Sequence, residues 1–296
     1  MAGSHTGMAD RLAALPGAVA LVVDRDGKRF EAVAGRRDLS AEPAMTADTV
    51  YWLASLTKPV LSVAVMQLVE RESLSLDAPI GRTVPALVAP LVLEGFDVAG
   101  RPKLRPARTA MTLRHLLTHT AGYGYHLWNP ELGRCLDQTG LPSIPVSPDE
   151  VARTPLLFDL GTGMAGLAVE AASGQSLDTY LRAHVLSARA CAGSARHARH
   201  LLFADAGAAG AAGADAPARG GGLCGTAGDY GRFLRMLLNG GALEGVRLLR
   251  AETVAAMGRT RSAIWRRTGW FRQCRGFPTT PGCAPAPGRN GGSASC

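Results

Sequence analysis

Tyr51-Trp52-Leu53-Ala54-Ser55-Leu56-Thr57-Lys58-Pro59 is the stretch that decides how this chain is interpreted. Ser55 and Lys58 are three positions apart, so on a helix the hydroxyl and the amine face the same way. Pro59 favours the start of a helix, because its fixed φ suits the first turn, where backbone N–H groups still have no partner. The stretch therefore predicts a helix over about residues 55–71 that begins with a hydroxyl beside an amine.

Residues 60–69 are apolar on nearly every face, which is typical of a buried core helix. Burial would lower the pKa of Lys58 and make its neutral amine available as a base. The positive end of the helix would favour an alkoxide developing on Ser55. The pair can thus act as nucleophile and base. A Ser-x-x-Lys pattern also arises by chance as an ordinary solvated helix start, so the rest of the sequence has to decide.

Five other segments have to be considered together with this stretch: residues 16–27 (PGAVALVVDRDG), 74–80 (LSLDAPI), 112–122 (TLRHLLTHTAG), 173–177 (SGQSL) and 221–230 (GGLCGTAGDY). Together with residues 49–58 these motifs resemble the serine β-lactamase superfamily, in particular its esterase-like and transesterase-like branch, the family VIII esterase-like serine hydrolases. The resemblance runs from about residue 13 to about residue 257, with gaps.

The resemblance implies an α/β (α+β) fold of the β-lactamase/transpeptidase type. An antiparallel sheet is flanked by helices, a second region is mostly helical, and the C-terminal end is expected to be incomplete. The resemblance also implies Ser55 as nucleophile and Lys58 as its base, with a small carboxylic ester cleaved through an acyl-serine intermediate. The alternatives are a β-lactamase acting on a lactam and a catalytically inactive remnant of the family.

Four further residues are assigned to the substrate pocket by position. In related esterases the loop after residue 122 borders the acyl pocket, which points to Tyr123, Tyr125 and Trp128. The glycine-rich segment of the family shapes the floor of the active site, which points to Gly222. A proton-transfer role for Tyr123 or Tyr125 is the alternative to lining the pocket.

Two parts of the family site are missing from the sequence. The family's third polar partner is a Tyr in a Tyr-x-Asn-like segment between residues 157–163 and 165–170, but only Met164 separates those pieces here. A Lys/His/Trp-x-Gly segment, whose strand supplies a second oxyanion N–H, has no convincing copy. We therefore expect impaired activity. No cofactor is expected.

The positive charge is concentrated at one end of the chain. The 296 residues carry a formal net charge of +8, yet no acidic residue follows Glu252, whereas seven arginines do. We expect a hydrolase domain at 1–257, with an atypical Ala/Gly/Arg-rich stretch at 187–219, and a basic tail at 258–296. Both unusual stretches are interpreted as frame-shifted or strongly diverged sequence, or alternatively as a natural low-complexity loop and a disordered tail.

Other classes of protein are weakly supported. His115 and His119 have a spacing that can bind zinc, but no third ligand or HExxH glutamate accompanies them, so a structural role and no metal site are expected. A protein that binds nucleic acid electrostatically through its basic tail is a third alternative, but the tail matches no nucleic-acid-binding module, so nucleic acid is not the expected partner. No apolar run is long enough to span a membrane, and no leader segment is recognised, so a cytoplasmic protein is expected, with a small-molecule ester or lactam as its partner. The oligomeric state stays open.

Several strands and helices are predicted from local sequence patterns. Strands are predicted at 18–23 and 29–34, joined by Asp24-Arg25-Asp26-Gly27, because an Asp-Gly pair favours a hairpin. Residues 79–108 are expected to form a loop with short helical turns, because proline recurs there. Residues 123–148 are expected to be irregular, because Gly, Pro and aromatic residues recur there. Helices are predicted at 111–118, 165–172, 177–185, 229–238 and 251–257.

Overall fold

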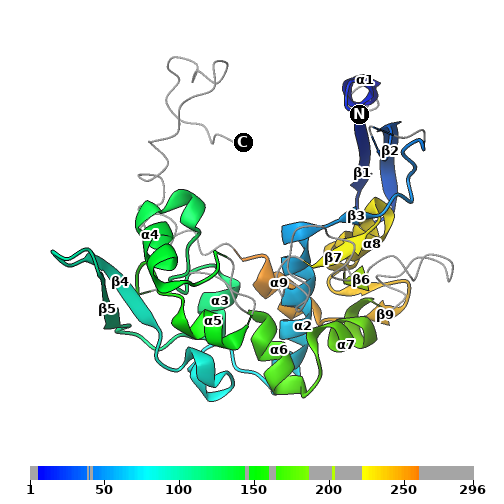
Figure 1. Ribbon diagram of the computed structural model, residues 1–296. Helices are drawn as coiled ribbons and strands as arrows, with labels where there is room; N and C mark the ends of the chain where they lie inside the picture. The colour runs from blue at the N-terminus through cyan, green and yellow to red at the C-terminus, as the bar shows by residue number, and fades with distance from the viewer. Residues whose placement is uncertain are drawn as a thin grey trace, which may run out of the picture. The chain divides into compact units, whose positions relative to one another are not determined.

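A computed structural model of the chain describes residues 6–38, 40, 43–143, 147–159, 165–186, 202–203 and 222–259 (Figure 1). The chain divides into two units, Met1–Ala256 and Met257–Cys296, and the second is described only at residues 257–259. The α-helices are α1 (Thr6–Ala13), α2 (Thr57–Glu70), α3 (Leu113–Leu117), α4 (Pro130–Thr139), α5 (Pro148–Arg153), α6 (Ala165–Ser173), α7 (Leu177–Leu181), α8 (Ala227–Leu238) and α9 (Ala251–Met257). Short 3-10 turns are η1 (Ala54–Leu56), η2 (Ile80–Arg82), η3 (Pro85–Leu87) and η4 (His126–Trp128), and η5 (Arg182–Leu186) is a π-helical turn.

The described strands form small antiparallel sheets. They are β1 (Gly17–Val23), β2 (Lys28–Gly35), β3 (Tyr51–Trp52), β4 (Leu91–Phe96), β5 (Pro102–Pro106), β6 (Leu202–Phe203), β7 (Leu223–Gly225), β8 (Ala242–Leu243) and β9 (Val246–Arg247). β1 pairs with β2, β4 with β5 and β8 with β9, while β7 lies between β3 and β6. This mixture of helices and antiparallel strands agrees with the expected α/β (α+β) class.

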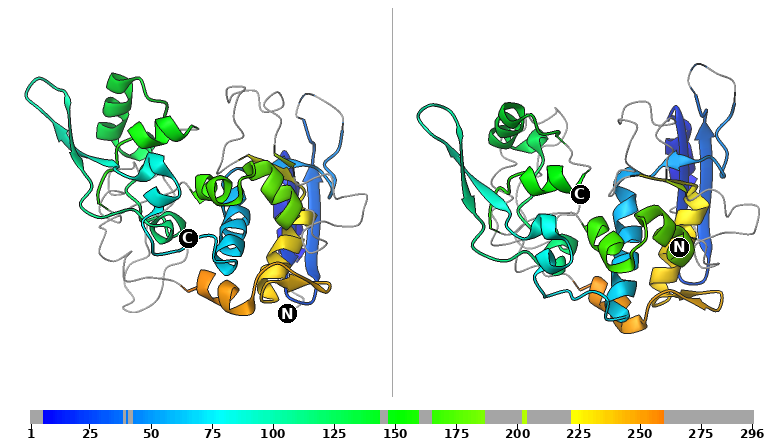
Figure 2. Two further views of the ribbon diagram at one scale, coloured as in Figure 1. Left: turned by 90° about the horizontal axis from the view of Figure 1, so that it is seen from below. Right: turned by 60° about the horizontal axis from the view of Figure 1, so that its bottom comes forward.

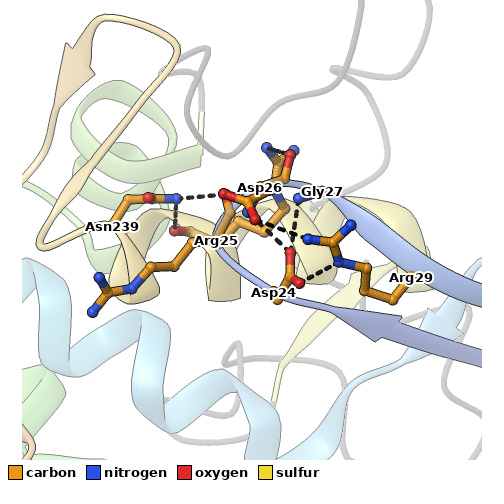
Figure 3. Close-up of polar contacts among 7 residues, drawn as sticks. Asp24, Arg25, Asp26, Gly27, Arg29 and Asn239 are labelled. Carbon is orange, nitrogen blue, oxygen red and sulfur yellow. Dashed lines mark hydrogen bonds and ion pairs between the residues drawn. The ribbon is translucent and has the colours of Figure 1, made fainter. Parts of the chain in front are cut away.

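The predicted N-terminal hairpin is confirmed. β1 and β2 pair antiparallel from Gly17 opposite Gly35, and the connecting residues 24–27 form the turn. The Asp24 carboxylate holds the turn by accepting hydrogen bonds from the backbone N–H groups of Asp26 and Gly27, at 2.9 and 3.0 Å (Figure 3). Such an Asx turn is the reason that Asp favours this position.

Helix α8 anchors this hairpin. At its C-terminal end, Asn239 donates a hydrogen bond of 3.0 Å to the backbone oxygen of Arg25 in the turn (Figure 3). Along its length α8 lies against β1 (Figure 2), and a Cβ atom on Gly231 would come within 2.5 Å of Leu21 Cδ2. A two-stranded hairpin is marginal in water, so this close contact gives the sheet a covered face.

Helix α2 lies in the core, as its apolar sequence predicts. Val63, Ala64 and Val65, on successive faces, each have 0% of their surface exposed. The helix contacts α6 and α7 (Figure 1). Burying a valine side chain completely stabilises the fold by about 1.5 kcal/mol or more, so α2 is a rigid support for whatever its first turn carries.

The prediction that residues 79–108 contain only loops and short turns is wrong for β4 and β5. Prolines delimit β5 at Pro102 and Pro106, whereas the interior of the hairpin pairs antiparallel, with Leu93 opposite Leu104 and a shift of register between Leu93 and Gly95. The turn is capped by Asp97, which accepts hydrogen bonds from the N–H groups of Ala99 and Arg101. Proline is tolerated at the ends of a strand and on edge strands. The prolines in this stretch therefore mark where a strand begins and ends and do not exclude a strand.

The irregular stretch predicted at 123–148 contains helix α4. Asn129 caps the helix by accepting a hydrogen bond from Leu132 N at 2.7 Å, Pro130 occupies the first turn, and Gly140 ends the helix in the left-handed conformation. These are ordinary helix start and stop residues. The helices predicted at 111–118, 165–172, 177–185, 229–238 and 251–257 are confirmed as α3, α6, α7 with η5, α8 and α9.

Candidate functional site

The hydroxyl of Ser55 and the amine of Lys58 lie beside each other. Lys58 Nζ donates a hydrogen bond to Ser55 Oγ at 3.1 Å. Ser55 is exposed on the 3-10 turn η1, and Lys58 is the second residue of α2. The α-helix thus begins at Thr57, two residues later than predicted, because residues 54–56 form the 3-10 turn η1. Residues three apart still stack in a 3-10 turn, so the pair keeps its predicted contact.

Burial makes Lys58 a better base than a lysine in water. Desolvation lowers the pKa of Lys58 from its ordinary value of 10.5, as the sequence predicted. A lowered pKa increases the fraction of neutral amine near neutral pH. The neutral amine can accept the Ser55 proton, so the two residues form a nucleophile and base in contact.

The nucleophile turn is held by a strand from the other end of the chain. Leu53 N donates to Leu223 O at 2.7 Å, and Leu223 N donates to Thr57 Oγ1 at 3.1 Å. Thr57 is completely buried, and Gly222, also buried, directly precedes Leu223. The structure therefore brings Gly222 beside the nucleophile turn. Its place in a substrate pocket stays a prediction.

Tyr230 also contacts this region, although sequence reasoning gave it no role in the site. Its hydroxyl, carried by α8, donates to the backbone oxygen of Leu56 at 3.2 Å. Burial raises the pKa of Tyr230, so it stays protonated as a hydrogen-bond donor. The contact joins residues 174 positions apart, and no local pattern could have indicated it.

The three aromatic residues predicted to line the pocket separate into two groups. The Tyr123 hydroxyl donates to Val151 O on α5 at 3.4 Å, and burial raises the pKa of this phenol. Tyr125 and Trp128 are 44% and 54% exposed and pack edge to face, with ring centroids 5.4 Å apart. None of these contacts involves Ser55 or Lys58, so their role in a substrate pocket stays a prediction.

The two histidines of the 112–122 motif differ. His115 caps α3: its Nδ1 accepts from Thr112 N at 3.2 Å, and its own N–H donates to Thr112 Oγ1 at 3.3 Å. This is the structural role expected from the sequence. His119 has a left-handed φ of 53°, and its pKa is lowered by desolvation and by the charge of Lys58. Across the described residues, no cluster of His, Cys, Asp and Glu could hold a metal ion.

Several predicted features lie outside the described residues. These are residues 160–164, part of the segment in which the family Tyr is predicted to be missing, most of the atypical stretch at 187–219, and the basic tail from residue 260 onward. In the part of the chain that is described, no helix has the length and apolar character needed to cross a bilayer.

Known proteins resemble this chain over most of its length. A family model described as Beta-lactamase matches residues 7–294. Monacolin J acid methylbutanoyltransferase of Aspergillus terreus is 36% identical over 186 residues, which are 58% of this chain and 45% of that protein. Esterase EstB of Burkholderia gladioli is 33% identical over 180 residues, covering 55% of this chain and 42% of the esterase.

A solved structure also resembles this chain. Unliganded simvastatin synthase (LovD) from Aspergillus terreus superposes with a TM-score of 0.66 at 28% identity, over 85% of this chain and 70% of that one. The matched segment spans about half the length of the two curated relatives, the transferase and the esterase. The family model covers nearly the whole chain, and the relatives carry acyltransferase and esterase names. The chain therefore belongs to the beta-lactamase family.

Proposed function

We propose that this chain cleaves small carboxylic esters through a covalent acyl-Ser55 intermediate. The observation that carries the proposal is the 3.1 Å hydrogen bond between Lys58 Nζ and Ser55 Oγ at the start of a buried helix. A serine hydroxyl is a weak nucleophile until a base in contact removes its proton. The lowered pKa of Lys58 supplies such a base without any cofactor.

The reaction follows from this pair. Neutral Lys58 accepts the Ser55 proton while Oγ attacks the ester carbonyl carbon and forms a tetrahedral intermediate. The C–O bond to the alcohol then breaks, the alcohol leaves with a proton, and the acyl group stays on Ser55. Water attacks the acyl-serine in the second half, releases the carboxylic acid and returns a proton to Ser55 Oγ. By resemblance, the Ser55 backbone N–H stabilises the oxyanion in both halves.

Acyl transfer is the second candidate function. The similarity to a protein named methylbutanoyltransferase favours it, as the similarity to EstB favours hydrolysis. The two reactions share the acyl-enzyme and differ only in whether water or an alcohol accepts the acyl group. Which of them dominates is measured by adding an alcohol acceptor during ester turnover and separating the acid from the new ester.

A fluorophosphonate probe tests the nucleophile directly. We expect the wild-type protein to be labelled at Ser55, and Ser55→Ala to lose the label. Ser62→Ala is the matched control, because Ser62 lies on the same helix and its hydroxyl donates only to the backbone oxygen of Lys58. Equal labelling of Ser55→Ala would assign the nucleophile elsewhere, and a folded wild-type protein without label would be an inactive member of the family.

Rates of turnover on an ester and on a cephalosporin distinguish an esterase from a β-lactamase. We expect slow, Ser55-dependent hydrolysis of p-nitrophenyl butyrate and slower or no hydrolysis of a chromogenic cephalosporin. Low rates are expected because the sequence lacks the family Tyr and the Lys/His/Trp-x-Gly segment. Faster cleavage of the cephalosporin than of the ester would identify a β-lactamase instead.

A further inference from the structure

Tyr230 is attached both to the nucleophile turn and to the strand that supports this turn. Its hydroxyl donates a hydrogen bond of 3.2 Å to Leu56 O, on the residue directly after Ser55. Its backbone belongs to α8, whose first turn is fixed by a buried pair. Asp229 N donates to Thr226 Oγ1 at 3.1 Å, and this hydroxyl donates to Asp229 Oδ2 at 2.7 Å. Thr226 directly follows β7, so the place of Tyr230 is fixed relative to the strand that pairs with β3.

The other end of α8 is held as well. Asn239 donates to the backbone oxygen of Arg25 in the hairpin turn (Figure 3), and the Arg235 guanidinium donates to Asp26 O at 3.2 Å. The helix that carries Tyr230 is therefore tied to the chain at both ends. A hydroxyl on such a rigid element is suited to holding another group in one geometry.

The nucleophile turn needs support from outside. Pro59 has no N–H, so the hydrogen bond that residue 59 of a regular helix would donate to Ser55 O cannot form. Ala54, directly before Ser55, has a φ of 45°, and a left-handed alanine persists only where the surrounding structure holds it. The shape of this turn therefore depends on tertiary contacts.

We propose that Tyr230 is a positioning residue for the attack by Ser55: its hydroxyl holds the Leu56 carbonyl and so keeps Ser55 Oγ in contact with Lys58 Nζ. This inference rests on the proposed ester cleavage. The Leu56 carbonyl belongs to the peptide group that joins η1 to α2, with Ser55 on one side and Lys58 on the other.

This peptide group controls the distance between the two reacting side chains. If its plane rotates, the 3-10 turn and the helix change direction relative to each other, and the 3.1 Å contact between Oγ and Nζ is lost. A displacement of about 1 Å between reacting groups can lower a rate about 100-fold. Tyr230 thus acts on the reaction through the backbone and not through the substrate.

The rate of fluorophosphonate labelling tests this role, because it reports the attack by Ser55 without deacylation. Tyr230→Phe removes the hydroxyl and keeps the ring, which packs against Phe233 with centroids 5.5 Å apart. A saturation curve gives KI for binding of the probe and kinact for the chemical step. The net contribution of one hydrogen bond corresponds to a factor of about 3 to 10, so kinact should fall by that factor while KI changes less than about twofold.

The final extent of labelling distinguishes positioning from a loss of folding. A protein with a misplaced serine is labelled slowly but completely, whereas a partly unfolded protein is labelled at the wild-type rate but incompletely. Tyr180→Phe is the matched control, because the Tyr180 hydroxyl donates to Gln67 Oε1 at 3.5 Å on the same helix α2. Gln67 lies about 16 Å along the helix from Leu56, so kinact of this control should equal that of the wild type.

Each other outcome would overturn the role of Tyr230. These outcomes are an unchanged kinact in Tyr230→Phe, a lower extent of labelling at an unchanged rate, and an equal loss of kinact in Tyr180→Phe. In all three cases, labelling of the wild-type protein that is lost in Ser55→Ala still supports the proposed function. A folded wild-type protein that is not labelled at Ser55 would overturn the proposed function, and the role of Tyr230 with it.

Discussion

Replacing Thr57 with valine should destabilise the protein, although valine is apolar and has nearly the same shape. Thr57 lies between Ser55 and Lys58 in the sequence, and the residue has 0% of its surface exposed. Its Oγ1 accepts a hydrogen bond from Leu223 N at 3.1 Å, in a fully buried contact. Valine would leave that N–H buried without an acceptor.

Two opposing contributions to the free energy of unfolding decide whether the valine variant is less or more stable. Exchanging a buried hydroxyl for a methyl group adds apolar burial worth up to about 0.8 kcal/mol. Leaving a buried N–H unsatisfied costs about 1–3 kcal/mol. With the full gain counted, the net destabilisation is about 0.2–2 kcal/mol, which lowers Tm by up to about 6 °C for a protein of this size.

Urea unfolding, thermal unfolding and hydrogen exchange check this prediction together. Thr57→Ser is the matched control, because it keeps the acceptor and loses only a methyl group. The Leu223 amide should lose its exchange protection in Thr57→Val and keep it in Thr57→Ser. A valine variant as stable as the wild type, or more stable, would refute the reasoning, because the added methyl group would then outweigh the lost hydrogen bond.

Three further predictions follow from single contacts. The kcat/KM for an ester should rise with pH to a plateau whose midpoint lies below 10.5, because Lys58 must be neutral to act as base and burial lowers its pKa; a midpoint at 10.5 or above would contradict this assignment. Arg105 hydrogen bonds lower the pKa of Asp159 from 3.8 to about 2, so the stability that this pair contributes is present above pH 3.8 and is lost as the pH falls toward 2. The difference in Tm between wild type and Asp159→Asn should therefore be largest above about pH 5 and close toward about pH 2, and a constant difference would argue against the pair. Gly122→Ala should cost at least about 2 kcal/mol in urea unfolding, because φ is +92° and the new Cβ would meet Phe158 O at 2.5 Å. The control Gly140→Ala, with φ at +67° and no atom within 4 Å, should cost about 1 kcal/mol, and equal losses would show that the close contact does not matter.

Local sequence patterns predicted many elements of the fold correctly. The Asp-Gly turn placed the β1–β2 hairpin, and the apolar run after Pro59 placed the buried helix α2. The β4–β5 hairpin and α4 were missed for one reason: proline was taken as a sign of irregular structure. In the structure, Pro102 and Pro106 delimit a strand and Pro130 begins a helix, positions where the absent N–H of proline costs nothing.

The candidate site likewise contains contacts that the sequence predicted and contacts that it did not. Ser55 and Lys58 could be paired from the sequence because three residues of separation bring side chains together in any helical turn. Thr57, Tyr230 and His119 carried no such sign. The sequence indicated no role for Thr57 and Tyr230, because they meet their partners, Leu223 and Leu56, 166 and 174 positions away. For His119 it predicted only a structural role.

The sequence by itself determined the chemistry that this protein carries: a hydroxyl and an amine in one turn, at the head of a helix too apolar to lie anywhere but the core. Only the tertiary structure decided what surrounds them. Leu223 reaches Thr57 across 166 residues, and Tyr230 reaches the backbone oxygen of Leu56 across 174 residues. The reason is physical: the period of a helix or strand sets the direction of neighbouring side chains, whereas distant residues meet only where whole elements pack.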